Sequence, residues 1–444
     1  MENRYDKYKD SGIAWIGEIP EHWEVIKIKQ LLKNNSLKVG PFGSQLSGSD
    51  ILSDGKYWIY NQRTVLDNNF SSCNSFITHE KYNDLIGFKV NAGDILLTTR
   101  GTIGKISRVP TTFNEGVIHP CIIRFNINES ILKYDILKYI FNDSDLVINQ
   151  VKYNSNSTTI DVIYSDTLKN IILTCIPKEE QQSIATYLDQ KCSEIDELIT
   201  LQEEMITKLQ SYKQSVITEA VTKGLDKNIP LKDSGIEWIG EIPEHWEIRT
   251  LKTMLSGIQD GTHGTFKNVI SDYLLLSAKN ITDNGLQFSD IERTISENDY
   301  KTIISNGYPQ KGDILLCCVG TIGRCCIYNY DRIYAFQRSV SFLRTNKNTS
   351  NRFLLYLLRS QICTTQFLMS ARTSAQSGIY LSTLSSLIII TPPLPEQQSI
   401  ADYLDQKCSE IDALISIKQQ KIEKLKDYKK SLIFECVTGK RKVS

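Results

Sequence analysis

Apolar residues recur along residues 184–216 at spacings of four, three and seven, the period of a helix seam that packs on another helix. Residues 400–432 repeat the pattern 216 positions later. The seam residues are Leu188, Cys192, Ile195, Ile199, Ile206, Leu209, Tyr212 and Val216 in the first stretch, and Leu404, Cys408, Ile411, Ile415, Ile422, Leu425, Tyr428 and Leu432 in the second. Each stretch predicts a long amphipathic helix with one face that must be covered.

Two such helices in one chain most simply cover each other, although two unconnected surface helices on one core are the alternative. A tandem duplication readily gives a pseudo-twofold axis, so we expect the two helices to run antiparallel with one insert at each end. Gln202 and Lys418 are the single polar positions of the two seams, and such a position commonly fixes register. The helix pair is expected to act as a ruler.

A second repeat precedes each insert. Residues 10–24 return with one substitution as residues 233–247, a shift of 223. The inserts between the constant blocks, about 25–179 and 248–395, share little continuous identity. This arrangement suits one scaffold that displays two different recognition surfaces. The repeated blocks contain Trp15, Trp23, Trp238 and Trp246, which we interpret as core residues that anchor each insert to the helices.

Each insert contains a strand-like run that turns back through Gly-Thr-Ile-Gly, at 93–105 and 312–324, which predicts a β-hairpin. Lys105 and Arg324 end these turns beside amides freed by glycine, a combination suited to phosphate, although a plain hairpin is the alternative.

Two further segments, 57–63 and 273–280, run from apolar residues into amide and cationic residues. Such side chains read base edges in a groove and are equally ordinary on a solvated loop. Residues 40–45 and 259–264 form corresponding turn-rich loops. We interpret Thr262 and His263 as contact residues, because no nucleophile with a partnered acid is suggested nearby.

Composition limits the class of protein. The 444 residues allow two or three domains, and 51 basic residues balance 51 acidic ones, so any polyanion site is a local patch. Eleven cysteines without a Cys-x-x-Cys motif indicate reduced, mostly buried thiols in a cytoplasmic protein rather than a metal site. There is no signal-like N-terminus and no apolar run of roughly 18 residues, so neither export nor membrane insertion is expected.

Catalytic motifs are missing as well. The sequence has no phosphate-binding loop of the ATPase type, no dinucleotide-binding glycine fingerprint and no histidines spaced for a metal. The string at 391–394, Thr-Pro-Pro-Leu, lacks both the amide and the ring of the tetrad that amino-methyltransferases use. A binding role is favoured over an enzyme. A helical adaptor that does not read DNA and a nuclease with dispersed carboxylates remain alternatives.

Several motifs, in order and twice over, carry a family likeness. They are the Asp-Ser-Gly-Ile-x-Trp-Ile-Gly block at 10 and 233, the Gly-Asp-Ile-Leu and Gly-Thr-Ile-Gly hairpins, Asp-Gly-Thr-His at 260, and Glu-Gln-Gln-x-Ile-Ala at 180 and 396. Together they resemble the specificity subunit of type I restriction-modification systems over essentially the whole chain. The resemblance implies two mixed α/β target-recognition domains separated by two long antiparallel coiled-coil helices. The expected segments are 1–176, 177–224, 225–394 and 395–444.

The resemblance also implies a function. Each domain would read one half of a bipartite DNA target, which we expect to be asymmetric because the inserts are unlike. If both domains face the same side of the duplex, the half-sites should lie about 10 base pairs apart, centre to centre. The helices would dock two methyltransferase subunits, to which a helicase-nuclease restriction subunit can be added. S-adenosylmethionine, ATP and magnesium would belong to those partners, and this chain would be non-catalytic. Base contacts cannot be transferred between the inserts, because they differ in length by seven residues.

Candidate DNA contacts in the first insert are Ser44, Gln62, Arg63, Arg100, Thr102 and Lys105. Those in the second are Thr262, His263, Lys279, Asn280, Thr321, Arg324 and Arg338. The candidate residues of the helix seam and partner surface are Leu188, Ile195, Ile199, Leu209, Leu404, Ile411, Ile415 and Leu425.

Overall fold

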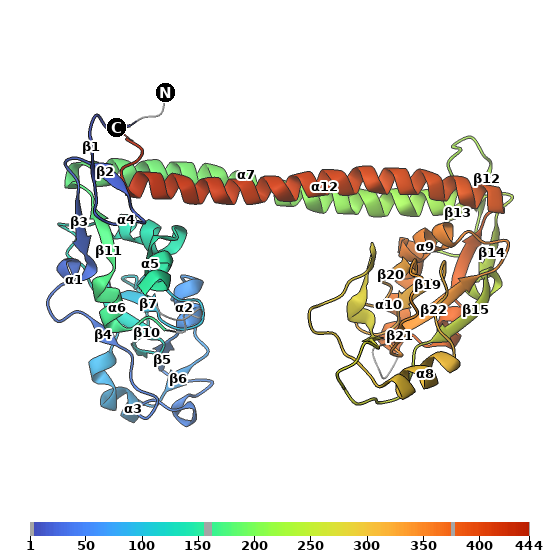
Figure 1. Cartoon of the computed structure of the whole chain (residues 1–444), viewed down its shortest axis with the longest axis horizontal. Helices are drawn as coiled ribbons and strands as arrows, with labels where there is room; N and C mark the ends of the chain where they lie inside the picture. The colour runs from blue at the N-terminus through green and yellow to red at the C-terminus, as the bar shows by residue number, and fades with distance from the viewer. Residues whose placement is uncertain (1–3, 155–161, 374–377, 444) are drawn as a thin grey trace. The chain divides into compact units, whose positions relative to one another are not determined.

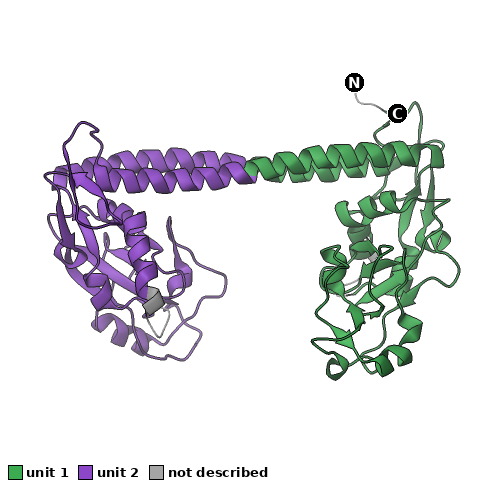
Figure 2. Ribbon diagram, turned by 180° about the vertical axis from the view of Figure 1, so that it is seen from behind, with its two compact units in different colours: residues 1–202, 420–444 green, residues 203–419 purple. Residues whose placement is uncertain are grey.

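Residues 4–154, 162–373 and 378–443 are described by the structure, a computed structural model of the chain (Figure 1). The chain forms two units, residues 1–202 with 420–444 (unit 1) and residues 203–419 (unit 2), shown in Figure 2. Each unit contains one insert, one repeated tryptophan block and parts of both long helices.

Unit 1 has a four-stranded antiparallel sheet in the order β4-β10-β7-β8. Its strands are β4 (Lys38–Val39), β10 (Ile122–Phe125), β7 (Ile95–Thr98) and β8 (Ile106–Arg108). Every residue of β7 is buried, and Leu97 pairs with Ile106 across the predicted hairpin, which is therefore confirmed. The Ile-Leu-Leu-Thr sequence of β7 is a continuous apolar run rather than an alternation of apolar and polar residues, because both faces of this strand are covered.

A second sheet of unit 1 has the order β6-β5-β9. It contains β6 (Phe76–Ile77), β5 (Tyr57–Tyr60) and β9 (Gly116–Ile118), with β5 and β9 parallel. The surrounding helical segments are α1 (Ile28–Leu31), η1 (Gly48–Asp50), α2 (Gln62–Leu66), α3 (His79–Asp84), η2 (Ile86–Phe88), α4 (Tyr134–Lys138), η3 (Tyr139–Asp143), α5 (Leu146–Asn154) and α6 (Ser165–Asn170).

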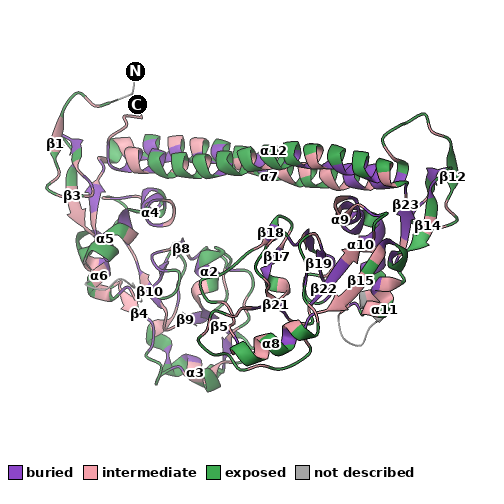
Figure 3. Ribbon diagram, turned by 45° about the vertical axis from the view of Figure 1, so that its right-hand side comes forward, coloured by how far each residue is buried: buried purple, intermediate pink, exposed green. Residues whose placement is uncertain are grey.

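Unit 2 repeats the main sheet in the order β15-β22-β19-β20. Its strands are β15 (Leu255–Asp260), β22 (Val340–Thr345), β19 (Ile314–Cys317) and β20 (Cys325–Ile327). Strand β19 is buried along its whole length (Figure 3). The smaller pairs are β16 (Leu275–Leu276) with β21 (Ala335–Phe336) and β17 (Ile281–Thr282) with β18 (Gly285–Leu286). The helical segments are η4 (Leu251–Met254), η5 (Ala278–Asn280), α8 (Glu297–Ser305), α9 (Asn351–Arg359), α10 (Gln361–Thr373) and α11 (Leu381–Ser385).

The two long helices are α7 (Lys178–Lys223) and α12 (Leu394–Val437). In unit 1 the segment before α7 meets the end of α12, where the Thr174 hydroxyl donates to the Val437 carbonyl, and Lys429 Nζ lies 2.7 Å from an Asp196 oxygen. In unit 2 Lys213 Nζ lies 2.7 Å from an Asp412 oxygen. The helices are therefore antiparallel, as predicted.

Most of the predicted seam is confirmed by burial. Leu188, Ile195, Leu404 and Ile411 are buried, and Ile199, Leu209, Ile415 and Leu425 are half-buried. The assignment of Tyr212 and Tyr428 to the seam is wrong, because their exposed fractions are 57% and 50%. Lys213 and Lys429 take those places, and each pairs with an aspartate of the other helix.

The repeated tryptophan block of each unit lies between the ends of the two helices. In unit 1 it forms β1 (Tyr8–Asp10) and β2 (Glu18–Pro20) and leads into β3 (Glu24–Lys27), which pairs with β11 (Ile172–Cys175). In unit 2 it forms β12 (Leu231–Asp233) and β13 (Glu241–Pro243) and leads into β14 (Glu247–Thr250), which pairs with β23 (Ile388–Thr391).

A buried tryptophan ties each block to a helix start. Trp23 Nε1 donates to Glu180 at 3.2 Å, and Trp246 Nε1 donates to Glu396 at 2.9 Å. Burial alone would raise the pKa of Glu180, but hydrogen bonds from Tyr5, His22 and Trp23 outweigh it and lower the pKa. The predicted core role is confirmed for Trp23 and Trp246, and Trp15 is half-buried against the core of unit 1. The prediction is wrong for Trp238, which is 41% exposed.

The far end of the other helix covers each indole. A Cβ atom on Gly439, past the end of α12, would lie 2.9 Å from the Trp23 ring, and one on Gly224, past the end of α7, would lie 3.2 Å from the Trp246 ring. Both glycines have positive φ, 73° and 74°, which is the usual conformation of a glycine that ends a helix. In each unit the tryptophan block therefore contacts the start of one long helix and the residues just past the end of the other.

Candidate nucleic-acid interface

In each unit, several loops gather at one end of the strands of the main sheet. In unit 1, Gly40 N donates to the Ile122 carbonyl at 2.9 Å and Thr99 N donates to the Cys121 carbonyl at 3.0 Å. The loops after β4 and β7 thus leave the sheet on either side of the start of β10. Residues 40–46, 99–105 and 119–121 form what we call the loop edge of unit 1.

Unit 2 has the same arrangement. Gly261 N donates to the Val340 carbonyl and Cys318 N donates to the Ser339 carbonyl, both at 2.9 Å. Residues 261–264, 318–324 and 337–339 are accordingly the loop edge of unit 2.

A glycine is required where each first loop leaves its sheet. A Cβ atom on Gly40 would lie 2.2 Å from the His119 carbonyl oxygen, and one on Gly261 would lie 2.3 Å from the Gln337 carbonyl oxygen. No side chain fits such a gap, and backbone cannot move aside cheaply. The motifs Gly-Pro-Phe-Gly and Asp-Gly-Thr-His therefore hold equivalent positions, although their other residues differ.

Most candidate residues of the first insert lie at or beside the loop edge. Arg100, Thr102 and Ser44 are exposed. Gln62 Nε2 donates to the Thr102 carbonyl at 3.3 Å, which brings the start of α2 to this edge. Arg63 is exposed and pairs with Asp67 on the same helix.

Lys105 differs from the expectation. Its ammonium donates to the Asn142 carbonyl inside unit 1, and burial lowers its pKa. The expectation that Lys105 is a free cation beside the turn is wrong, because the protein itself uses the ammonium group.

In the second insert the structure brings three candidates together. Thr262 N donates to the Phe336 carbonyl at 2.8 Å, and Arg338 N donates to the Thr262 carbonyl at 2.9 Å. His263 and Arg338 are exposed, and His263 Nε2 lies 3.8 Å from Asp260. Burial raises the pKa of Asp260. Thr321 is exposed on the hairpin turn of the same edge.

Asn280 serves the fold instead, whereas Lys279 is exposed. Asn280 is only 1% exposed, and its amide donates to the Gln287 carbonyl and to Glu292 at 3.1 and 2.8 Å. Lys279 Nζ lies 3.0 Å from Glu292. The expectation of an exposed polar tip at Asn280 is wrong, because this side chain satisfies buried backbone and carboxylate groups.

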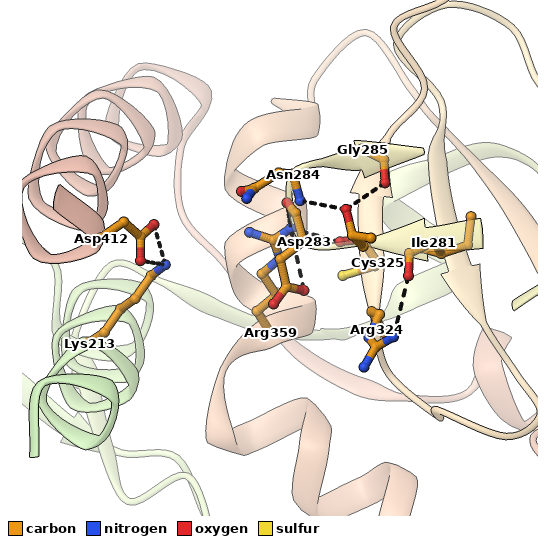
Figure 4. A network of polar contacts seen from close by, with 10 residues as sticks. Lys213, Ile281, Asp283, Asn284, Gly285, Arg324, Cys325, Arg359 and Asp412 are labelled. Atoms are coloured by element: carbon orange, nitrogen blue, oxygen red, sulfur yellow. Dashed lines mark hydrogen bonds and ion pairs between the residues drawn. The ribbon is translucent and has the colours of Figure 1, made fainter. Parts of the chain in front are cut away.

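Arg324 lies beside the β17–β18 hairpin (Figure 4). It is exposed and donates to the Ile281 carbonyl at a long 3.5 Å, so the guanidinium keeps most of its donors free. Arg359 holds the same hairpin against β20, with bonds to the carbonyls of Asp283 and Cys325 at 2.5 and 2.7 Å. Our sequence reasoning missed Arg359. Its counterpart in unit 1, Asn142, likewise bonds the backbone of Ile106.

The cysteines beside the second hairpin are inert at neutral pH. Burial raises the pKa of Cys317, Cys318 and Cys325 to about 11 and that of Cys326 to about 12, so the thiols stay neutral. All eleven cysteines are unpaired. Within residues 4–154, 162–373 and 378–443, no group of three or more His, Cys, Asp or Glu side chains could hold a metal ion.

An apolar stripe on the long helices faces solvent. Leu198 and Leu201 on α7 are 43% and 51% exposed, and Leu414 and Ile417 on α12 are 48% and 58% exposed. The two pairs correspond under the shift of 216 and are spaced i, i+3, so each pair shares one helix face. We call these the apolar pairs. The seam residues proposed for partner docking are covered within each unit, so the apolar pairs are the better docking candidates.

The chain has relatives of known class. Residues 20–210 and 266–427 match the family described as "Type I restriction modification DNA specificity domain". The chain belongs to this family. The putative type I restriction enzyme MjaX specificity subunit of Methanocaldococcus jannaschii is 25% identical, with 96% of each chain covered. The MjaVIII specificity subunit of the same organism is 29% identical over 65% of this chain and 66% of the relative.

A solved structure from a study of "complex assembly and conformational transition of the type I R-M system" has the same fold. Its TM-score is 0.66 at 16% identity, covering 94% of this chain and 98% of the other. The sequence prediction of a specificity subunit with two recognition domains and two long helices is thereby confirmed. No helix in the described part of this specificity subunit is long and apolar enough to cross a membrane.

Proposed function

We propose that each loop edge reads one half of a bipartite DNA sequence. The supporting observation is that two sheets of the same topology present equivalent loops with different side chains. Arg100 and Thr102 stand on one edge, and His263, Thr321 and Arg338 on the other. Arginine and polar side chains of this kind bond base edges and phosphates, and unlike edges would read an asymmetric target.

The partners follow from the helices. We propose that the apolar pairs dock two methyltransferase subunits, one at Leu198 and Leu201 and one at Leu414 and Ile417, and that restriction subunits join through them. S-adenosylmethionine, ATP and magnesium would be bound by those partners, and this chain would contribute no catalytic group. A complex acting on cellular DNA would work in the cytoplasm. The half-sites would lie about 10 base pairs apart.

DNA reading is tested with the complex of this chain and its methyltransferase. Methylome sequencing of a host that expresses both would give the target, and binding to duplexes with altered half-sites would follow. Arg338→Ala should weaken binding about 10- to 100-fold and relax one half-site only, since a bidentate base contact discriminates by ~1–3 kcal/mol. Arg249→Ala is the matched control, because this exposed arginine lies on β14, away from the loop edge.

Two outcomes would overturn the reading of DNA. One is equal weakening by both arginine variants, and the other is a complex that methylates no bipartite sequence.

Docking is tested by co-purification. Ile417→Asp and Leu201→Asp should each lose one methyltransferase copy, while Ser416→Asp, at an exposed neighbouring position, should keep both. Retention of both copies by the double variant Leu201→Asp/Ile417→Asp would place the partner surface elsewhere.

A further inference from the structure

Among the described residues of unit 1, the most exposed large apolar side chain is Phe42, with 78% of its surface exposed. It lies on the loop edge, in an ordered turn. Phe42 N donates to Gln45 Oε1 at 3.0 Å, and the Phe42 carbonyl accepts from Gln45 N and Leu46 N at 2.8 and 3.1 Å. Leu46 is buried and fastens the turn to the unit. The ring is therefore held in solvent by a defined backbone.

Scattered apolar residues are normal on protein surfaces, so exposure alone decides nothing. The position of Phe42 on the loop edge is what suggests a role for its ring. Phe42 follows Gly40 by two residues on one side of the start of β10, and Arg100 follows Thr98 by two residues on the other side. Strands in a sheet lie about 4.8 Å apart, so the two loops begin about 10 Å from each other. The loop that carries Phe42 thus begins beside the loop that carries Arg100 and Thr102.

The equivalent position in unit 2 is chemically different. Gly40 and Gly261 occupy the same place in their sheets, so His263 is the counterpart of Phe42. His263 can exchange hydrogen bonds with a base edge, whereas Phe42 cannot. The two loop edges therefore present different chemistry two residues after the shared glycine.

We infer that Phe42 reads a T·A base pair by packing its ring against the 5-methyl group of thymine in the major groove. This inference rests on the proposed function. The thymine methyl is the one methyl group that the unmodified bases present in the major groove, and the hydrogen-bonding groups there are donors and acceptors. A ring placed against those polar groups would strip them of water without replacing their hydrogen bonds.

The test replaces thymine with deoxyuridine, one position at a time, in duplexes that carry the methylome-mapped target. Deoxyuridine removes only the methyl group. The wild-type complex should bind about four-fold more weakly when the critical thymine in the unit 1 half-site is replaced, as burial of one methyl group predicts. In Phe42→Ala the same replacement should have no effect, while deoxyuridine in the other half-site should act as in the wild type.

Tyr428→Ala is the matched control, because Tyr428 is an exposed aromatic residue on α12 rather than on the loop edge. It should keep the four-fold discrimination. Loss of affinity in Phe42→Ala that is equal for thymine and deoxyuridine duplexes would overturn the inference and indicate a ring that wedges between bases. Equal binding of the thymine and deoxyuridine duplexes by the wild-type complex would overturn it too. Failure of the wild-type complex to bind any mapped target would instead reject the proposed function.

Discussion

The last turns of α12 belong to the core of unit 1, which makes a sharp prediction about Ile433. This residue is fully buried in the core of the first recognition domain, although it lies more than 200 positions beyond that insert in the sequence. Ile433→Ala removes three carbons, worth ~2.4 kcal/mol of transfer free energy at ~0.8 kcal/mol each. The cavity left behind adds to this, so we expect unit 1 to lose ~3–4 kcal/mol.

The matched variant is Ile217→Ala. Ile217 occupies the same place on α7 under the shift of 216 and is 4% exposed in the core of unit 2. Hydrogen exchange followed by mass spectrometry can report the two units separately, through β7 and β10 for unit 1 and β19 and β22 for unit 2. At about 1.4 kcal/mol per factor of ten, the amides of the affected unit should open a hundred-fold or more faster.

The two variants should give mirrored patterns, while Tyr428→Ala on the exposed face of α12 should change neither unit by more than ~0.5 kcal/mol. Faster exchange confined to β19 and β22 in Ile433→Ala would refute the assignment of the helix end to unit 1. Equal acceleration in both units would show that they open as one body.

Three other perturbations have defined outcomes. Glu180→Gln should cost unit 1 ~1.5–3 kcal/mol, since the amide cannot accept all the bonds from Tyr5, His22 and Trp23, and chemical denaturation should reveal it. Lys429→Asp should lower the melting temperature, because it places a second carboxylate beside Asp196. Adding Asp196→Lys should restore part of the lost melting temperature. No recovery in the double variant would mean that the ion pair contributes nothing to register. Burial alone would raise the pKa of Glu292, but bonds from Ser289 and Lys279 lower it to about 2, so the stability it contributes is complete above about pH 4.5 and is lost as the pH falls toward 2. Proteolysis between residues 280 and 292 should increase over that acid range in the wild type and already at neutral pH in Glu292→Gln.

The heptad pattern predicted both helices because a covered stripe has to be apolar wherever it runs. It failed at one position of each helix. From Leu209 a step of three reaches Tyr212 and a step of four reaches Lys213, and apolar character favours the tyrosine. The structure uses Lys213, which is 24% exposed, because an aspartate of the other helix lies within reach of its ammonium group. Only the fold supplies that aspartate.

The candidate site shows the same limit. The glycine hairpins could be located from sequence, since a tight turn demands glycine. The direction of the Lys105 side chain could not, because the carbonyl that accepts its hydrogen bond belongs to Asn142, in a helical segment 37 residues further along the chain. The position of Asn280 at the end of an apolar segment favours a DNA contact from sequence alone. In the structure its amide is buried and donates hydrogen bonds to the Gln287 carbonyl and to Glu292. The sequence shows which polar side chains each segment contains, but not which groups those side chains contact in the folded protein.

The discontinuous make-up of unit 1 has a consequence for synthesis on the ribosome. Residues 203–419 form unit 2 without a break, so that unit can close as soon as they have emerged. Unit 1 is begun first, yet its core waits for Leu432, Ile433, Cys436 and Val437. The recognition domain that is translated first is thus the one completed last. A chain whose translation stops before these residues would carry a complete unit 2 and an incomplete unit 1. During normal synthesis, unit 1 stays open to proteases until the end of α12 has been translated.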